Sequence, residues 1–126
     1  MDLPLLSSLA RIPGPPTPRW PAGARVDVVL ERHGLLFELY VPGPVDDQQP
    51  HRRDELYIVA SGSADFVRDV AGAGAGADQA RTAAVAVGDA LFVPAGEAHR
   101  FARCSADFAT WVVFFGPEHD LDKSRP

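Results

Sequence analysis

From residue 26 to residue 116 the chain consists of short runs rich in β-branched and aromatic residues, separated by turn residues. Runs of about four to eight such residues, bounded by Gly, Pro, Asn or Asp, predict β-strands. We expect strands in RVDVVLER (25–32), LLFELYV (35–41), ELYIVASG (55–62), SADFVRDV (63–70), AHRFAR (98–103) and DFATWVVFFG (107–116), and two more in RTAAVAVGDALFVPAG (81–96). Many short strands joined by Gly and Pro turns predict an all-β domain, either a sandwich or a barrel.

The two ends of the chain lack this strand pattern. Prolines are frequent near the start, at Pro4, Pro13, Pro15, Pro16, Pro18 and Pro21. Such a density of proline is incompatible with a helix or a central strand, so residues 1–25 are expected to form a Pro-rich arm that lies over the domain. Residues 26–116 form the β domain, and residues 117–126 a polar tail. The Gly/Ala segment AGAGAGADQA (71–80) is expected to be a flexible hairpin tip.

Composition narrows the class of protein further. The 126 residues are 46% hydrophobic and 23% charged, which is typical of one soluble globular domain. The net charge is −5, and Arg52–Arg53 is the largest basic cluster, so neither nucleic acid nor a membrane surface is expected as a partner. The single cysteine, Cys104, cannot form an intramolecular disulfide. No export signal or apolar span of about 20 residues is found, so we expect a cytoplasmic protein.

Two segments carry the residues that could bind a metal or take part in catalysis. The first includes QQPHRRDELYIVASG (48–62), and its anchors are Gly43, Gln49, His51, Glu55 and Gly62. The second is GDALFVPAGEAH (88–99), and its anchors are Gly88, Pro94, Gly96 and His99. Positions two apart in a strand share a face, so Gln49, His51, Glu55 and Tyr57 can all face the interior of the domain.

Two imidazoles and one carboxylate form the ligand set of non-haem Fe(II) sites, which leaves positions open for substrate or dioxygen. Mn(II), Ni(II), Zn(II) and Cu(II) accept the same nitrogen and oxygen ligands. Each residue also has an ordinary alternative, because His51 could cap a loop and His99 could be a hydrogen-bonded core histidine. Glu55 could likewise pair with Arg53 or Arg100.

These two segments resemble the motifs of the cupin family, G-x5-H-x-H-x3/4-E-x6-G and G-x5-P-x-G-x2-H-x3-N. All the anchor spacings of the family are present, but Gln49 occupies the place of the first histidine and Arg103 that of the terminal asparagine. The resemblance covers residues 43–103 directly. It implies a double-stranded β-helix, or jelly-roll barrel, with a pocket at its mouth and one divalent transition metal. The resemblance assigns His51, Glu55 and His99 as metal ligands, while Gln49 either coordinates weakly, holds a water on the metal, or faces the substrate.

We expect a metal-dependent enzyme that acts on a small organic substrate, with a dioxygenase favoured by the facial ligand set. Tyr57 would orient the substrate, and Glu55 could alternatively act as a general base. The second hypothesis is a non-catalytic barrel that binds a small molecule or a metal, which the missing first histidine supports. We also expect a homodimer, because an exposed edge strand favours pairing and Trp20 of the arm could reach a partner subunit.

Overall fold

The structure, a computed structural model, describes residues 1–69 and 80–119. Its elements are α1 (Leu5–Leu9), β1 (Val26–Arg32), β2 (Leu35–Tyr40), β3 (Asp54–Ser61), β4 (Ser63–Asp69), β5 (Ala80–Ala86), β6 (Ala90–Val93), β7 (His99–Ala102) and β8 (Ala109–Phe115). Each predicted strand is present, so the all-β prediction is confirmed. Residues 71–79 of the expected hairpin tip and the end of the tail, 120–126, lie outside the described residues.

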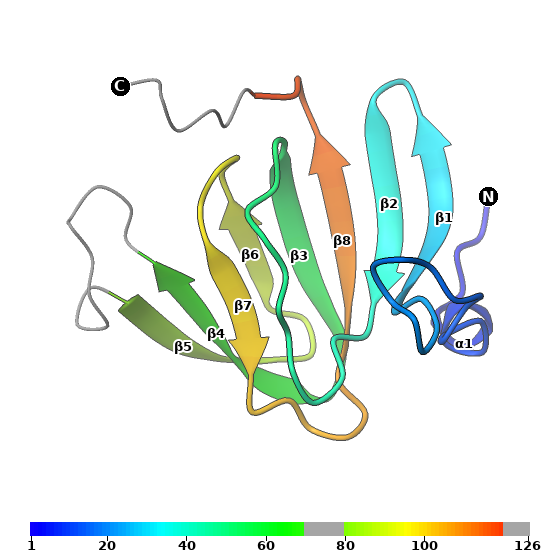
Figure 1. The fold of residues 1–126 in the computed structure, drawn as a ribbon, viewed down its shortest axis with the longest axis horizontal. Helices are drawn as coiled ribbons and strands as arrows, with labels where there is room; N and C mark the ends of the chain where they lie inside the picture. The colour runs from blue at the N-terminus through cyan, green and yellow to red at the C-terminus, as the bar shows by residue number, and fades with distance from the viewer. Residues whose placement is uncertain (70–79, 120–126) are drawn as a thin grey trace.

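The strands form two antiparallel sheets, shown in Figure 1. The larger sheet has the strand order β1-β2-β8-β3-β6, and the smaller has the order β5-β4-β7. In β3 the buried and partly buried positions alternate, as a strand with one face on the core requires. The core lies between the two sheets, where Tyr57 of β3 packs edge-on against Phe101 of β7 at 4.9 Å between ring centroids.

The arm contains one short helix, which corrects the prediction that residues 1–25 hold none. Helix α1 begins after Pro4, which stands at its N-cap, where the missing proline N–H removes no helical hydrogen bond. The helix is fixed to β1, because Ser8 donates a hydrogen bond to Asp27 at 2.7 Å and Arg11 forms an ion pair with Asp27 at 2.8 Å. In Figure 1 the helix lies beside the β1–β2 hairpin. Within the part of the chain that the structure describes, no helix is long and apolar enough to cross a membrane.

Two glycine-containing turns place the strands that build the site. His33 and Gly34 join β1 to β2 with φ values of 50° and 79°, which is the conformation of a two-residue hairpin turn. His33 is therefore a turn residue. Gly62, with a φ of 70°, lies between the last residue of β3 and the first of β4, where the chain passes from the larger sheet to the smaller.

Candidate metal centre

His51, Glu55 and His99 come together from three different parts of the fold. His51 lies in the loop before β3, Glu55 lies in β3, and His99 is the first residue of β7. One potential ligand atom from each of the three lies within 4.8 Å of the others. Backbone contacts hold the two motif segments together, because the Gly96 N–H donates to the His51 carbonyl at 2.9 Å. The long-range pairing of these motifs thus brings two imidazoles and one carboxylate to one point.

The Glu55 carboxylate is buried, and its contacts with neighbouring side chains lack hydrogen-bond geometry. Its side chain is 1% exposed, and among the described residues no donor forms a hydrogen bond to either carboxylate oxygen. His99 Nε2 lies 2.8 Å from Glu55 Oε1, and His51 Nε2 lies 3.9 Å from the same oxygen, without hydrogen-bond geometry in either case. A buried carboxylate is costly unless a cation or hydrogen bonds compensate its charge. The donor set therefore fits a divalent transition metal, which would satisfy both oxygens and both rings.

The environment of His99 also favours positive charge at this point. Its Nδ1 lies 2.8 Å from the Glu97 carbonyl, so Nδ1–H donates to that carbonyl and Nε2 is directed at Glu55. Burial by itself lowers the pKa of His99, but the Glu55 carboxylate outweighs burial and raises this pKa above its ordinary value. The pKa of His51 is lowered, mainly by burial, which favours the neutral ring that metals bind.

The glutamine that faces this centre is Gln48, and Gln49 lies outside it. Gln49 is exposed, and its side-chain amide donates to the Asp47 carbonyl at 3.5 Å. Gln48 Oε1 lies 3.0 Å from His51 Nε2 and accepts a hydrogen bond from the Tyr57 hydroxyl at 3.0 Å. The regular strand begins only at Asp54, so the alternation that would direct Gln49 inward does not extend to it. Pro50, which cannot donate to a strand ladder, separates it from the strand.

Asp46 fixes the orientation of the Gln48 amide. The buried Asp46 carboxylate accepts hydrogen bonds from Gln48 Nε2 at 2.7 Å, from the Tyr40 hydroxyl at 2.5 Å and from the Phe101 N–H at 2.8 Å. Because a carboxylate accepts only, the amide nitrogen faces Asp46 and Oε1 faces the centre. Asp46, Tyr40 and Phe101 thereby hold a neutral acceptor beside His51.

Tyr57 connects the amide to the buried histidine. Its hydroxyl lies 2.9 Å from His99 Nε2 as well as 3.0 Å from Gln48 Oε1. Burial, followed by the charge of Glu55, raises the pKa of Tyr57 well above its ordinary value. The phenol therefore keeps its proton at neutral pH and acts as a hydrogen-bond donor.

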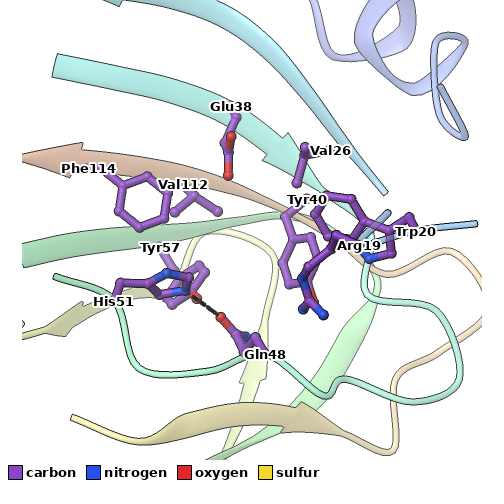
Figure 2. Close-up of a pocket in the computed structure, with 10 residues that line it drawn as sticks. All are labelled: Arg19, Trp20, Val26, Glu38, Tyr40, Gln48, His51, Tyr57, Val112 and Phe114. Atoms are coloured by element: carbon purple, nitrogen blue, oxygen red, sulfur yellow. Dashed lines mark hydrogen bonds between the residues drawn. The ribbon is translucent and has the colours of Figure 1, made fainter. Parts of the chain in front are cut away.

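A pocket opens from the centre toward the N-terminal arm (Figure 2). Its lining residues come from the arm, from the loop before β3 and from four strands: Arg19, Trp20, Val26, Glu38, Tyr40, Gln48, His51, Tyr57, Val112 and Phe114. The space open to the centres of water-sized spheres is about 60 Å³, which holds several water molecules, since one needs about 10–15 Å³ on this measure. The side chains of Arg19 and His51 are 42% and 34% exposed and mark the side that faces solvent. The pocket is therefore suited to a small molecule.

Sequence reasoning missed Glu38 and Gln48. Glu38 carries the only charge in LLFELY, an apolar strand, and this is a signal that could have identified it. Gln48 gave no such signal, because loop residues have no periodicity that assigns a direction. Trp20 packs against the core of its own chain and lines the pocket, rather than extending from the domain.

Comparison with known proteins identifies one relative in sequence and several in structure. No family model matches the sequence. The uncharacterized protein SCO3923 of Streptomyces coelicolor is 40% identical over 98 residues, which cover 76% of this chain and 83% of the relative. At this identity and coverage the two chains belong to one family.

Solved structures share the fold. A protein from Ralstonia eutropha, described as a candidate mannose-6-phosphate isomerase, is 29% identical, with a TM-score of 0.53 over 73% of this chain and 83% of that chain. A cupin superfamily protein from Desulfitobacterium hafniense is 15% identical, with a TM-score of 0.54 over 73% and 76% of the two chains. Protein NMB1881 from Neisseria meningitidis is 18% identical, with a TM-score of 0.60 over 92% and 100%.

Proposed function

This chain belongs to the family of SCO3923 from Streptomyces coelicolor and has the fold of the cupin superfamily, and on that basis we propose that it is a mononuclear metal-dependent enzyme. Its substrate is a small organic molecule that enters the pocket beside His51. Oxygenase chemistry is the first candidate, because the ligand set consists of two histidines and one carboxylate. The observation that carries the proposal is the buried Glu55 carboxylate, which has two histidine rings beside it and no contact of hydrogen-bond geometry among the described residues.

His51, Glu55 and His99 would hold the metal. A bound divalent metal supplies Lewis acidity, and iron in such a ligand set also supplies reactivity toward dioxygen. The Glu97 carbonyl orients the His99 ring by accepting its Nδ1–H, so that Nε2 is directed to the centre. In the metal-free chain His51 Nε2 is hydrogen-bonded to Gln48 Oε1, so a metal on this nitrogen would take the place of that proton.

Tyr57 and Gln48 form the polar edge of the pocket beside the centre. The Tyr57 phenol remains protonated and donates a hydrogen bond, while Gln48 Oε1 accepts one. A substrate with an oxygen near the centre can receive the Tyr57 hydrogen bond, and one with a hydroxyl can donate to Gln48. Trp20, Val112 and Phe114 supply the apolar wall that excludes water from this part of the pocket.

The test is the metal content of untagged protein, measured by elemental mass spectrometry after anaerobic reconstitution. We expect about one transition-metal ion per chain, and a loss of at least about tenfold in metal affinity in His51→Ala and in His99→Ala, because each removes a ligand. His33→Ala is the matched control, since His33 lies in an exposed turn. Gln49→Ala is expected to keep its metal, because the Gln49 side chain lies outside the centre.

The metal that is found directs the next assay, and iron would call for measurement of oxygen consumption with a panel of small organic acids and alcohols. Wild-type protein without metal after reconstitution contradicts the proposal. Stoichiometric metal in a protein that turns over no substrate would favour the alternative of a binding barrel. That alternative has one observation in its favour, namely that Gln49, in the position of the first motif histidine, is exposed.

A further inference from the structure

Glu38 is an acidic residue in the apolar wall of the pocket. It lies in β2 between Phe37 and Leu39, and its strand neighbour on β8 is Val112, which in turn pairs with Tyr57 of β3. Since strands in a sheet are about 4.8 Å apart, the Glu38 backbone lies about 10 Å from that of Tyr57. Figure 2 shows the Glu38 carboxylate directed from β2 into the pocket, across from His51 and Gln48.

The Glu38 carboxylate has no partner among the described residues. The groups that face the pocket around it are Arg19, Tyr40, Gln48, His51 and Tyr57, and none forms a hydrogen bond or an ion pair with it. Arg19 is engaged with Asp47 at 3.3 Å and with the Trp20 ring at 4.9 Å. The Tyr40 hydroxyl donates to Asp46, and the Tyr57 hydroxyl lies against Gln48 and His99. Glu38 is half-buried and its oxygens face the pocket, so a ligand there could supply the hydrogen bond that no side chain gives, which indicates a role in binding.

Burial, together with the charge of Glu55, raises the pKa of Glu38 to about 7. An approaching hydrogen-bond donor or cation would lower this pKa by stabilising the charged form of Glu38. The aromatic rings of Trp20, Tyr40 and Phe114 in the same pocket are compatible with an ammonium group as well as with a hydroxyl.

We propose that Glu38 is a second anchor of the pocket, which receives a hydrogen bond from the far end of a small ligand whose near end lies at His51, Glu55 and His99. The ligand is a short molecule with a metal-binding oxygen at one end and an alcohol or protonated amine at the other. This inference rests on the proposed function and adds the chemical class of the ligand. Glu38 is the specificity-determining residue for the far end.

The proposal can be tested with hydroxamate probes on protein loaded with Zn(II) or Ni(II). All probes share one metal-binding group and differ in the tail, which ends in a methyl, a hydroxyl or an ammonium group after one to three methylenes. We expect the best hydroxyl or ammonium tail to bind about tenfold to hundredfold more tightly than the methyl tail of equal length, the range of a hydrogen bond to a charged group. The hydroxyl and ammonium arms separate the two ligand types.

In Glu38→Gln this preference should fall to less than about threefold, while the methyl probe keeps its wild-type affinity within about twofold. Glu38→Leu should abolish the preference altogether. Glu31→Gln is the matched control, because Glu31 is an exposed carboxylate on the neighbouring strand β1. Wild-type protein without any tail preference, or a preference that survives in Glu38→Gln, overturns the proposal.

A metal-free arm separates this proposal from the metal centre itself. The carboxyl carbon of Glu38 is followed by NMR while propylamine or propanol is added to the metal-free protein. We expect the apparent pKa of Glu38 to fall on addition of the amine, with no change at Glu31. A protein that binds no metal but shows this response would contradict the metal-dependent function and still support the role of Glu38. An unresponsive Glu38 overturns the role.

Discussion

His99 shows how one residue is prepared by its neighbours for metal binding. Its side chain is fully buried, its Nδ1 is held by the Glu97 carbonyl, and its Nε2 lies 2.8 Å from the Glu55 carboxylate. In the metal-free protein a proton on Nε2 is favoured by Glu55, which raises the pKa of His99 despite burial. The same position that stabilises a proton would stabilise a metal cation, so the two compete.

This competition predicts a pH dependence of metal binding. The pKa of His99 is raised above the ordinary value of about 6.5. At pH values below this raised pKa the ring is protonated, so it must release a proton before it can bind metal. We expect the metal affinity to be constant at pH above the His99 pKa and to fall about tenfold for each pH unit below it. Chelator competition between pH 5.5 and 8.5 measures this, and an affinity independent of pH over the whole range would contradict it.

The same raised pKa has the opposite consequence for the stability of the metal-free fold. Because the folded state binds this proton more tightly than the unfolded state, protonation of His99 stabilises the fold. This contribution is fully present below the unfolded pKa of about 6.5, and it is lost as pH rises through the folded pKa. His51 acts against it, because its lowered pKa favours the neutral ring and removes stability at acid pH. Protonation of His99 therefore weakens metal binding but stabilises the metal-free fold.

At the scale of elements, the site depends on the corner where β3 passes into β4. Gly62 at this corner has a φ of 70°, and a Cβ placed there would lie 2.9 Å from the Phe108 Cα and 2.7 Å from Asp107 Oδ1. The adjoining Ser63 is bonded to Ser105 in both directions, since the Ser105 N–H donates to the Ser63 carbonyl and the Ser63 N–H to Ser105 Oγ. At this corner the backbone of Gly62 is in the left-handed region and its surroundings are closely packed. The corner therefore holds β3, with Glu55 and Tyr57, against the smaller sheet.

Two glycines that anchor the sequence motifs provide a matched test of this corner. Gly88 also has a positive φ, 92°, but a Cβ there would meet nothing within 4 Å. We expect Gly88→Ala to cost about 1–2 kcal/mol of unfolding free energy for backbone strain alone, and Gly62→Ala to cost about 3 kcal/mol or more, because it adds a backbone clash. Denaturant unfolding of the two variants measures the difference, and equal costs would show that the corner relaxes around an added methyl.

At the scale of the whole molecule, the larger sheet has an apolar outer face, directed away from the core. We define this outer face by Phe37, Leu56, Ile58, Phe92, Trp111 and Val113, none of which belongs to the core cluster. Phe37 stacks on Trp111 at 5.0 Å, and Phe92 is 49% exposed. Strand β8, ATWVVFF, is apolar on both faces, a pattern typical of strands that are covered on both sides.

We therefore propose a homodimer that forms through this outer face, because a second copy would supply a matching apolar surface. Phe92→Glu places a charge in the face and should shift the protein to monomer. Val87→Glu is the matched control, since Val87 is 63% exposed but lies outside the outer face, and this variant should remain dimeric. Sedimentation equilibrium measures both, and a monomeric wild type would contradict the expectation.

The sequence by itself determined the strands and four of the residues in the candidate site. Alternation along β3 placed Glu55 and Tyr57 on one face, and the spacing of the two motifs identified His51 and His99 as their companions. Glu55 and Tyr57 could be predicted because a strand has a period of two, which ties each side chain to a face as soon as one neighbour is known. His51 and His99 were identified through the resemblance of the two segments to the cupin motifs, because no strand period extends to His51 in its loop.

Only the tertiary structure decided which glutamine faces the centre, that Leu5–Leu9 form a helix, and that Glu38 lines the pocket. Gln48 and Gln49 lie in a loop, where no period assigns a direction, and Asp46 fixes the Gln48 amide through contacts that span 55 residues of sequence. Glu38 lies in a regular strand, and its lone charge marks it as unusual, but both faces of the larger sheet are apolar, so the sequence pattern could not say which face is inside. The direction of a side chain follows from local sequence only where one face of its element is distinguished from the other, and elsewhere long-range packing determines it.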